Sequence, residues 1–247
     1  MAVEIKGKLR GRIGNVVYRV VNGKQFAQSL PSRKRKKRKA TMHNRHFAKA
    51  STFGSCVYGP IKRFGLNAVD YSFYHKLVSI GKKQIFNEHA LLEHEKYHDW
   101  NLIPDTDYLE INPKSDVNRY FGVLPNLIVD NNEIVVQVEA IKFGNYKKLA
   151  LKDANNFQIC ISLVHYTFDE VYAGTYLYKS DVFTTFKGSD GIEFRIDLDT
   201  LEPPVKNMLI IVCYGLFFSP TNEIPHYLNT KDFNPIGVLG MYYKKQE

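Results

Sequence analysis

Residues 208–218 read MLIIVCYGLFF, the longest nearly unbroken apolar stretch in the chain. The stretch is too short for a membrane-spanning helix, which needs roughly 18 apolar residues or more. Its length and its β-branched and aromatic residues favour a strand. Because side chains alternate between the two sides of a strand, a strand that is apolar throughout needs cover on both faces. We therefore expect 208–218 to be a central strand of a sheet or a strand at an interface.

Strand-like segments recur around this stretch from residue 105 onward. Hydrophobic and polar residues alternate in EIVVQVE (133–139) and IEFRIDL (192–198), and turn-forming residues separate the segments. About eight such segments in about 140 residues are typical of an antiparallel sandwich or barrel. We predict an α+β fold, mainly β, in which residues 105–247 form an antiparallel β-sandwich.

Residues 40–104 are predicted to be a helical segment. Apolar residues spaced three or four apart mark one side of a first helix; they are Phe47, Ala50, Gly54, Val57, Ile61 and Phe64. The pair Gly59–Pro60 predicts a break or kink in that helix. Two more helices are expected at 70–80 and 84–100, and a domain boundary at 101–107.

Residues 1–39 are predicted to form a basic N-terminal β-ribbon or arm. The dipeptide Asn22-Gly23 between two strand-like runs is a strong signal for a two-residue hairpin turn. In the first run, Val16, Tyr18 and Val20 should point to one side and the intervening residues to the other. An isolated ribbon is marginally stable in water, so we expect the rest of the chain or a partner to cover it.

Charge is distributed unevenly along the 247 residues, whose formal net charge is +9. Residues 1–66 hold 17 Lys and Arg against one acidic residue, a net charge of +16, and the other 181 residues carry −7. Such asymmetry favours an anionic partner for the basic part: nucleic acid, a membrane surface, an acidic protein or the acidic part of a neighbouring copy. The alternative is a solvated flexible linker.

The most basic stretch, RKRKKRK (33–39), and the helix that follows it supply the candidate anion-binding residues. These are Arg33, Lys34, Arg35, Lys36, Lys37, Arg38, Lys39, Arg45 and Lys49. Further cations that could engage phosphates are Arg10, Arg12, Arg19, Lys24, Lys62 and Arg63. Contacts of this kind would be largely independent of nucleotide sequence and strongly dependent on salt.

The three cysteines, Cys56, Cys160 and Cys213, have no close spacing. We interpret them as reduced thiols of a reducing compartment, with Cys160 and Cys213 buried inside apolar strands. The start MAVEIKGKLR lacks the apolar core of a secretory signal, and no stretch is long enough to span a membrane. We expect no membrane association.

Residues 94–98 spell HEKYH, which matches the H-E-x-x-H pattern of zinc hydrolases, with Glu95 as the general base. Lys96 would place a cation beside the metal, so we favour a polar surface helix and expect no metal, no cofactor and no enzymatic activity. Gly7, Gly11 and Gly14 match no nucleotide-binding fingerprint, and we expect them in turns or bulges.

The N-terminal third resembles an uncharacterised family of bacteroidete proteins that are often encoded in or near phage and prophage regions. The resemblance rests on GRIGNVVYRVVNGK (11–24), SLP (29–31) and RHFAKAS (45–51). It implies a short β N-terminus, a basic linker, a helix and a C-terminal β-sandwich. It also implies a structural or assembly role, and it carries over no catalytic residues.

These observations predict a non-enzymatic structural protein, such as a phage head–tail connector or tail component, whose basic arm docks on an anionic partner. Its partners would be copies of itself and other assembly proteins, in a virion made in the host cytoplasm, or in the cytoplasm if the protein is cellular. The alternative is a ribosome- or nucleoid-associated protein that binds DNA or RNA through 33–39. A remote alternative is a zinc hydrolase at HEKYH.

Overall fold

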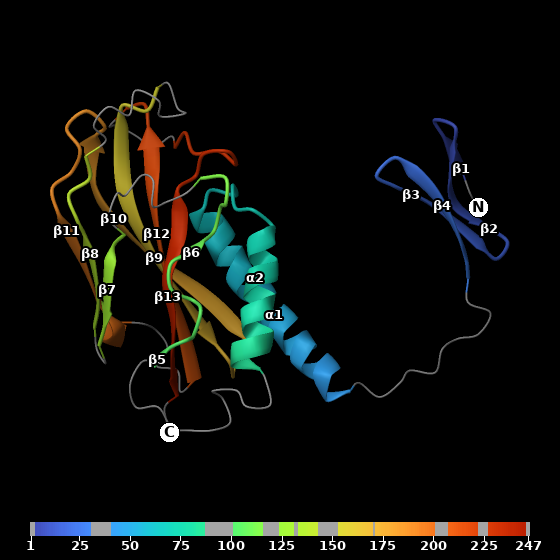
Figure 1. Cartoon of the computed structure of the whole chain (residues 1–247), viewed down its shortest axis with the longest axis horizontal. Coiled ribbons are helices and arrows are strands. Elements are labelled where there is room, and N and C mark those ends of the chain that lie inside the picture. The colour runs from blue at the N-terminus through green and yellow to red at the C-terminus, as the bar shows by residue number, and fades with distance from the viewer. Residues whose placement is uncertain are drawn as a thin grey trace. The chain divides into compact units, whose positions relative to one another are not determined.

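The computed structural model describes residues 3–30, 41–86, 101–115, 124–130, 133–142, 153–169, 171–200, 207–221 and 227–245. The chain divides into two compact units, Met1–Thr41 and Met42–Glu247, which we call the N-terminal unit and the body. Figure 1 shows their secondary structure. Each unit is described by itself.

The body is built around a six-stranded antiparallel sheet whose central strand is β12 (Asn207–Ser219). This strand contains the apolar stretch 208–218, and the prediction of a central strand is confirmed. Side chains 208–218 are all buried, because a second sheet lies on one face of β12 and helices lie on the other (Figure 1). The sheet order is β10 (Tyr172–Thr184), β9 (Asn156–Thr167), β12, β13 (Ile236–Lys245) and β5 (Asn101–Leu102), with β6 (Leu109–Glu110) also pairing with β13.

A three-stranded sheet packs against one face of the large sheet, in the order β11 (Ile192–Asp197), β8 (Glu133–Val138) and β7 (Asn126–Val129). A 3-10 turn, η2 (Leu198–Thr200), follows β11. Ile134 and Val136 of β8 share a hydrophobic core with Ile161 of β9 and Ile210 of β12. The predicted α+β, mainly β fold class is therefore confirmed, and the two sheets form a sandwich.

Two helices cover the opposite face of the large sheet (Figure 1). They are α1 (Met42–Phe64) and α2 (Ser72–Ile80), and α2 continues into a π-helical turn, η1 (Gly81–Ile85). Phe53 and Phe73 from these helices join Tyr166 of β9 and Leu209 of β12 in a second core. Of the residues predicted for the buried side of α1, all but Phe47 are buried, and Phe47 is 52% exposed.

One local prediction in the helical segment needs correction. The expected break at Gly59–Pro60 does not occur, because helix α1 runs through Pro60 to Phe64. Pro60, Ile61 and Phe64 are buried, and Ile61 and Phe64 share a core with the large sheet; this burial outweighs the backbone hydrogen bond that proline removes. The predicted helix at 84–100 begins within η1, and residues 87–100 lie outside the described part of the chain.

The segment 40–104 and the sandwich 105–247, which we expected as separate parts, share one compact unit. The helices pack on the large sheet, and β5 pairs with β13 on the other side of the expected boundary at 101–107. Asn234 also donates a 2.8 Å hydrogen bond to the carbonyl of Gly65, at the end of α1. The body is therefore a three-layer arrangement of helices, large sheet and small sheet.

Candidate anion-binding surface

The described part of the N-terminal unit is a four-stranded antiparallel meander of β1 (Val3–Ile5), β2 (Lys8–Ile13), β3 (Val16–Val21) and β4 (Lys24–Ser29). The hairpin predicted at Asn22-Gly23 is confirmed, because β3 pairs with β4 around that dipeptide. Asn22 and Gly23 have φ values of 49° and 77°, the positive values that a type I′ turn requires. Turn chemistry thus accounts for the β3–β4 connection.

The strand register gives this sheet two unlike faces. Residues directly opposite each other in an antiparallel pair point to the same side, and Arg12 lies opposite Val17, Arg19 opposite Phe26, and Val21 opposite Lys24. We call this side the basic face; its residues are Arg12, Val17, Arg19, Val21, Lys24 and Phe26. Over residues 12–27 the other side of the sheet carries no charged residue, and we call this part the uncharged face; its residues are Ile13, Val16, Tyr18, Val20, Gln25 and Ala27.

Positive charge on the basic face is not neutralised within its own sheet. Glu4 is the only acidic residue among residues 3–30, against six Lys and Arg. The Arg12 Nε donates to the carbonyl of Gly14 at 2.7 Å, and the Lys8 ammonium donates to the carbonyl of Gly23. Both cations therefore bond to neutral acceptors and keep their charge available to an external anion.

The N-terminal sheet has no core of its own in the described residues. None of residues 3–30 is buried, and Ile13 and Phe26 are 51% and 52% exposed. Exposed apolar side chains on both faces of a small sheet mark surfaces that another molecule can cover. The cover that we expected for this ribbon is therefore not supplied by a core within residues 3–30.

Two of the nine candidate anion-binding residues, Arg45 and Lys49, are described, and both are exposed on the first turns of α1. They are four residues apart, so they lie on the same side of the helix. No residue of 42–49 is buried, and the buried side of α1 begins at Ala50. Residues 33–39 lie outside the described residues, so the structure does not test whether the nine come together.

Sequence reasoning did not include Arg12, Arg19 and Lys24 in the candidate set, although it named them as further cations. The signal that could have promoted them was the combination of strand alternation with the Asn22-Gly23 turn. That turn sets the β3–β4 register, and the register places Arg19 and Lys24 on one face.

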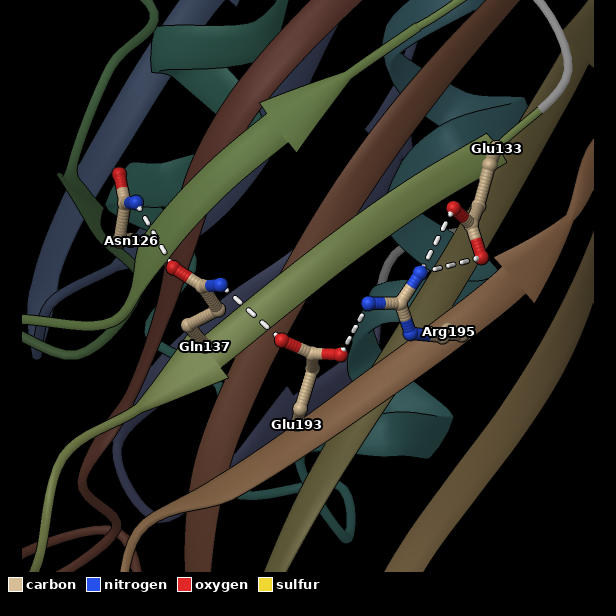
Figure 2. Close-up of polar contacts among 5 residues, drawn as sticks. All are labelled: Asn126, Glu133, Gln137, Glu193 and Arg195. Carbon is tan, nitrogen blue, oxygen red and sulfur yellow. Dashed lines mark hydrogen bonds and ion pairs between the residues drawn. The ribbon is translucent and has the colours of Figure 1, made fainter.

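On the outer face of the three-stranded sheet, in contrast to the basic face, the charged side chains of Arg195, Glu133 and Glu193 are paired with one another (Figure 2). Arg195 lies between two glutamates, with 2.6 Å to Glu193 and 3.2 Å to Glu133. Gln137 extends the ladder by donating to Glu193 at 3.0 Å and accepting from Asn126 at 3.2 Å. Hydrogen bonds from Gln137 and Arg195 lower the pKa of Glu193. Charges on this face are mutually satisfied and offer little to an external anion.

The other predicted chemistry concerns cysteines and a metal. Cys160 and Cys213 are buried, as predicted, and burial raises the pKa of the Cys160 thiol to about 12 and also raises that of Cys213. Both thiols are therefore neutral at physiological pH. HEKYH (94–98) lies outside the described residues, and within the described ranges no three His, Cys, Asp or Glu side chains gather to hold a metal ion.

No protein-family model matches the chain, and no curated protein or solved structure is significantly similar to it. The resemblance to the bacteroidete family therefore stays a prediction. Among the described residues, no helix is both long enough and apolar enough to cross a bilayer.

Proposed function

We propose that this chain is a non-enzymatic assembly protein that docks on an anionic partner through the basic face of its N-terminal sheet. The observation that carries the proposal is the segregation of that sheet into a basic and an uncharged face, in a unit with no buried residue among those described. A sheet built in this way offers two different surfaces and has little stability of its own.

The two faces suit two different contacts. Like charges disfavour packing of one basic face on another, which leaves the uncharged face for self-association. Val16, Tyr18 and Val20 supply the apolar area for such a contact between copies of the chain. The basic face then points outward from the paired sheets toward an anionic surface. A phage head–tail connector or tail is the setting that the resemblance implies, and we propose it together with the role.

Light scattering coupled to size-exclusion chromatography tests this role on the full chain. We expect an oligomer of fixed mass that resists nuclease, shows no excess absorbance at 260 nm and persists at high salt. A monomer at all concentrations and salt conditions would overturn the proposal. Apolar contacts between subunits should survive salt, whereas contacts to phosphates should not.

Heparin chromatography tests the basic face, with heparin as a defined polyanion. The triple variant Arg12→Glu, Arg19→Glu and Lys24→Glu should elute at markedly lower salt than the unmodified chain. The matched control Lys83→Glu, Lys142→Glu and Lys187→Glu changes the net charge equally, at exposed positions of the body. Equal elution of the two variants would show that net charge alone, and not the basic face, holds the polyanion.

Single-stranded nucleic acid is the second candidate partner, because the half-exposed ring of Phe26 lies opposite Arg19 on the basic face. An exposed aromatic ring among cations can stack on bases while the cations hold phosphates. In that case Phe26→Ala should weaken binding of a single-stranded oligonucleotide, and the triple variant should reduce the salt dependence of binding. A nucleic-acid-bound monomer that releases its cargo at high salt would favour this candidate over the assembly role.

A further inference from the structure

A cavity of about 260 Å³ lies between the last turn of α1 and the β10 edge of the large sheet. Phe64 and Leu66 form its helix side, and Phe217 of β12 and Ser162 of β9 line its sheet side. Two cations, Arg63 of α1 and Lys179 of β10, also line it. This site belongs to the body, and none of its lining residues comes from the N-terminal unit.

The cavity lies where the helices leave part of the helix side of β10 uncovered. Strand β10 is the edge strand, and its pairing with β9 places Leu177 opposite Ser162 and Lys179 opposite Cys160. Opposed residues share a face, and Cys160 belongs to the core under the helices, so Leu177 and Lys179 lie on the helix side of the sheet. Leu177 is nevertheless 52% exposed. Small side chains at positions 160, 162 and 175 leave the space unfilled.

Two residues that line the cavity, Lys179 and Tyr227, belong to a chain of hydrogen bonds. The Lys179 ammonium donates to the Tyr227 hydroxyl at 3.2 Å, and that hydroxyl donates to Gln158 Oε1 at 2.8 Å. Gln158 in turn donates to the carbonyl of Ser180 at 2.7 Å. Lys179 is thus positioned by neutral groups, and its nitrogen also lies 5.6 Å from the centre of the Tyr227 ring.

The charged side chains among the described residues that line the cavity are all positive. Among the described lining residues there are two cations, Arg63 and Lys179, and no carboxylate. The hydroxyls of Ser162 and Thr175 bond to each other at 3.0 Å, so they present no unsatisfied polar group to the interior. Cys160 contributes a neutral thiol, which behaves as a small apolar group. The lining therefore combines an apolar interior with uncompensated positive charge.

We infer that this cavity binds a small carboxylic acid with an apolar body, such as a medium-chain fatty acid or an aryl carboxylate. A dry apolar cavity of roughly 150 Å³ accommodates benzene, so the larger volume here suits a ring or short chain together with a carboxylate. Arg63 and Lys179 would bind the carboxylate, and Phe64, Leu66 and Phe217 would surround the apolar body. A neutral or cationic ligand of the same length would leave Arg63 and Lys179 without a counter-charge.

Titration calorimetry with octanoate, octanol and octylamine on the full chain tests the inference. We expect saturable binding of octanoate with one site per chain, about tenfold weaker binding of octanol, and no binding of octylamine. Equal binding of octanol and octanoate would overturn the inference, because the cavity would then select only for apolarity. The absence of saturable octanoate binding would overturn it too.

Three variants locate the site. Arg63→Gln and Lys179→Gln should each weaken octanoate binding about threefold to tenfold, whereas Lys187→Gln removes an exposed charge elsewhere and should leave the affinity unchanged. Ser162→Leu should fill the cavity and abolish binding. Arg63 and Lys179 are exposed, so their variants should fold even if Ser162→Leu does not. Unchanged affinity in both charge variants would place the octanoate elsewhere and refute the assignment.

Discussion

The N-terminal sheet and the large sheet of the body are both antiparallel, yet they are stabilised in opposite ways. In the large sheet, β12 and β9 lie between two hydrophobic layers, and nearly all their side chains are buried. In the N-terminal sheet no described residue is buried, although its strands also contain many β-branched residues. Strands with a similar local preference for β structure are thus buried to very different extents in the two sheets.

The difference separates what turns specify from what packing specifies. In the N-terminal sheet, the Asn22-Gly23 turn fixes the register of β3 and β4 through backbone geometry. In the large sheet, β12 pairs with β9 and β13 over long sequence separations, and the shared cores on both faces hold that arrangement. A unit specified mainly by turns is suited to gain its stability from a partner, which is the role proposed for it.

The largest expected effect comes from the same substitution made in each sheet. Ile210 of β12 is fully buried and Ile13 of β2 is 51% exposed. Ile210→Ala should lower the free energy of unfolding by about 2–5 kcal/mol, because it removes buried contacts and leaves a cavity. Ile13→Ala should change it by less than about 0.5 kcal/mol in the monomer. Urea unfolding followed by far-ultraviolet circular dichroism measures both.

This pair of variants also tests the uncharged face. If Ile13→Ala costs as much as Ile210→Ala at concentrations where the chain is monomeric, the uncharged face is covered within a single chain. The contrast between the sheets would then fail. If the loss appears only where the protein is oligomeric, the uncharged face is a contact between copies.

Lowering the pH is expected to have an effect of intermediate size on stability, and the effect should be confined to the body. His165 of β9 is 3% exposed, its Nδ1 has no hydrogen-bond partner among the described residues, and its ring lies between Tyr172 and Tyr176. Burial lowers its pKa below the ordinary value of about 6.5. As pH falls below about 6.5, the unfolded chain gains a proton that the folded chain resists, so the body loses stability until the folded pKa is passed.

His165→Phe should therefore reduce the fall in the urea midpoint between pH 7.5 and pH 5, while retaining an aromatic ring beside Tyr172 and Tyr176. The matched variant His75→Phe changes an exposed histidine of α2 and should keep the pH dependence of the unmodified chain. Residues 3–30 contain no histidine, so this effect should not extend to the N-terminal sheet. Identical profiles for the two variants would remove His165 as the cause.

Sequence patterns were most informative where one local feature decides the outcome. The apolar run 208–218 predicted a strand covered on both sides, and the spacing from Phe47 to Phe64 predicted the buried side of α1 at every position except Phe47. Asn22-Gly23 predicted a hairpin for the same reason, since a two-residue turn requires little from the rest of the chain. The fold class follows from these elements.

Features that depend on distant parts of the chain were not predictable. The continuation of α1 through Pro60 depends on packing against the large sheet, and the bond from Asn234 to Gly65 joins residues 169 positions apart. The cavity that we propose binds a carboxylate depends on the register of β10 against β9 and on where the helical layer ends. Of the candidate anion site, sequence predicted that cations gather near the N-terminus, and only the register showed that Arg12 and Arg19 share a face.

The smallest effect is expected where charge is exposed but paired. Arg195 is flanked by Glu133 and Glu193 on the outer face of the small sheet (Figure 2), and its side chain is 62% exposed. Solvent and salt weaken exposed ion pairs, so Arg195→Gln should leave the urea midpoint unchanged within error. It should also leave heparin elution almost unchanged, because the cation it removes is already neutralised. A loss of heparin retention as large as that of the basic-face triple variant would mean that paired charges bind polyanions as well as unpaired ones, and the electrostatic distinction between the two exposed faces would not hold.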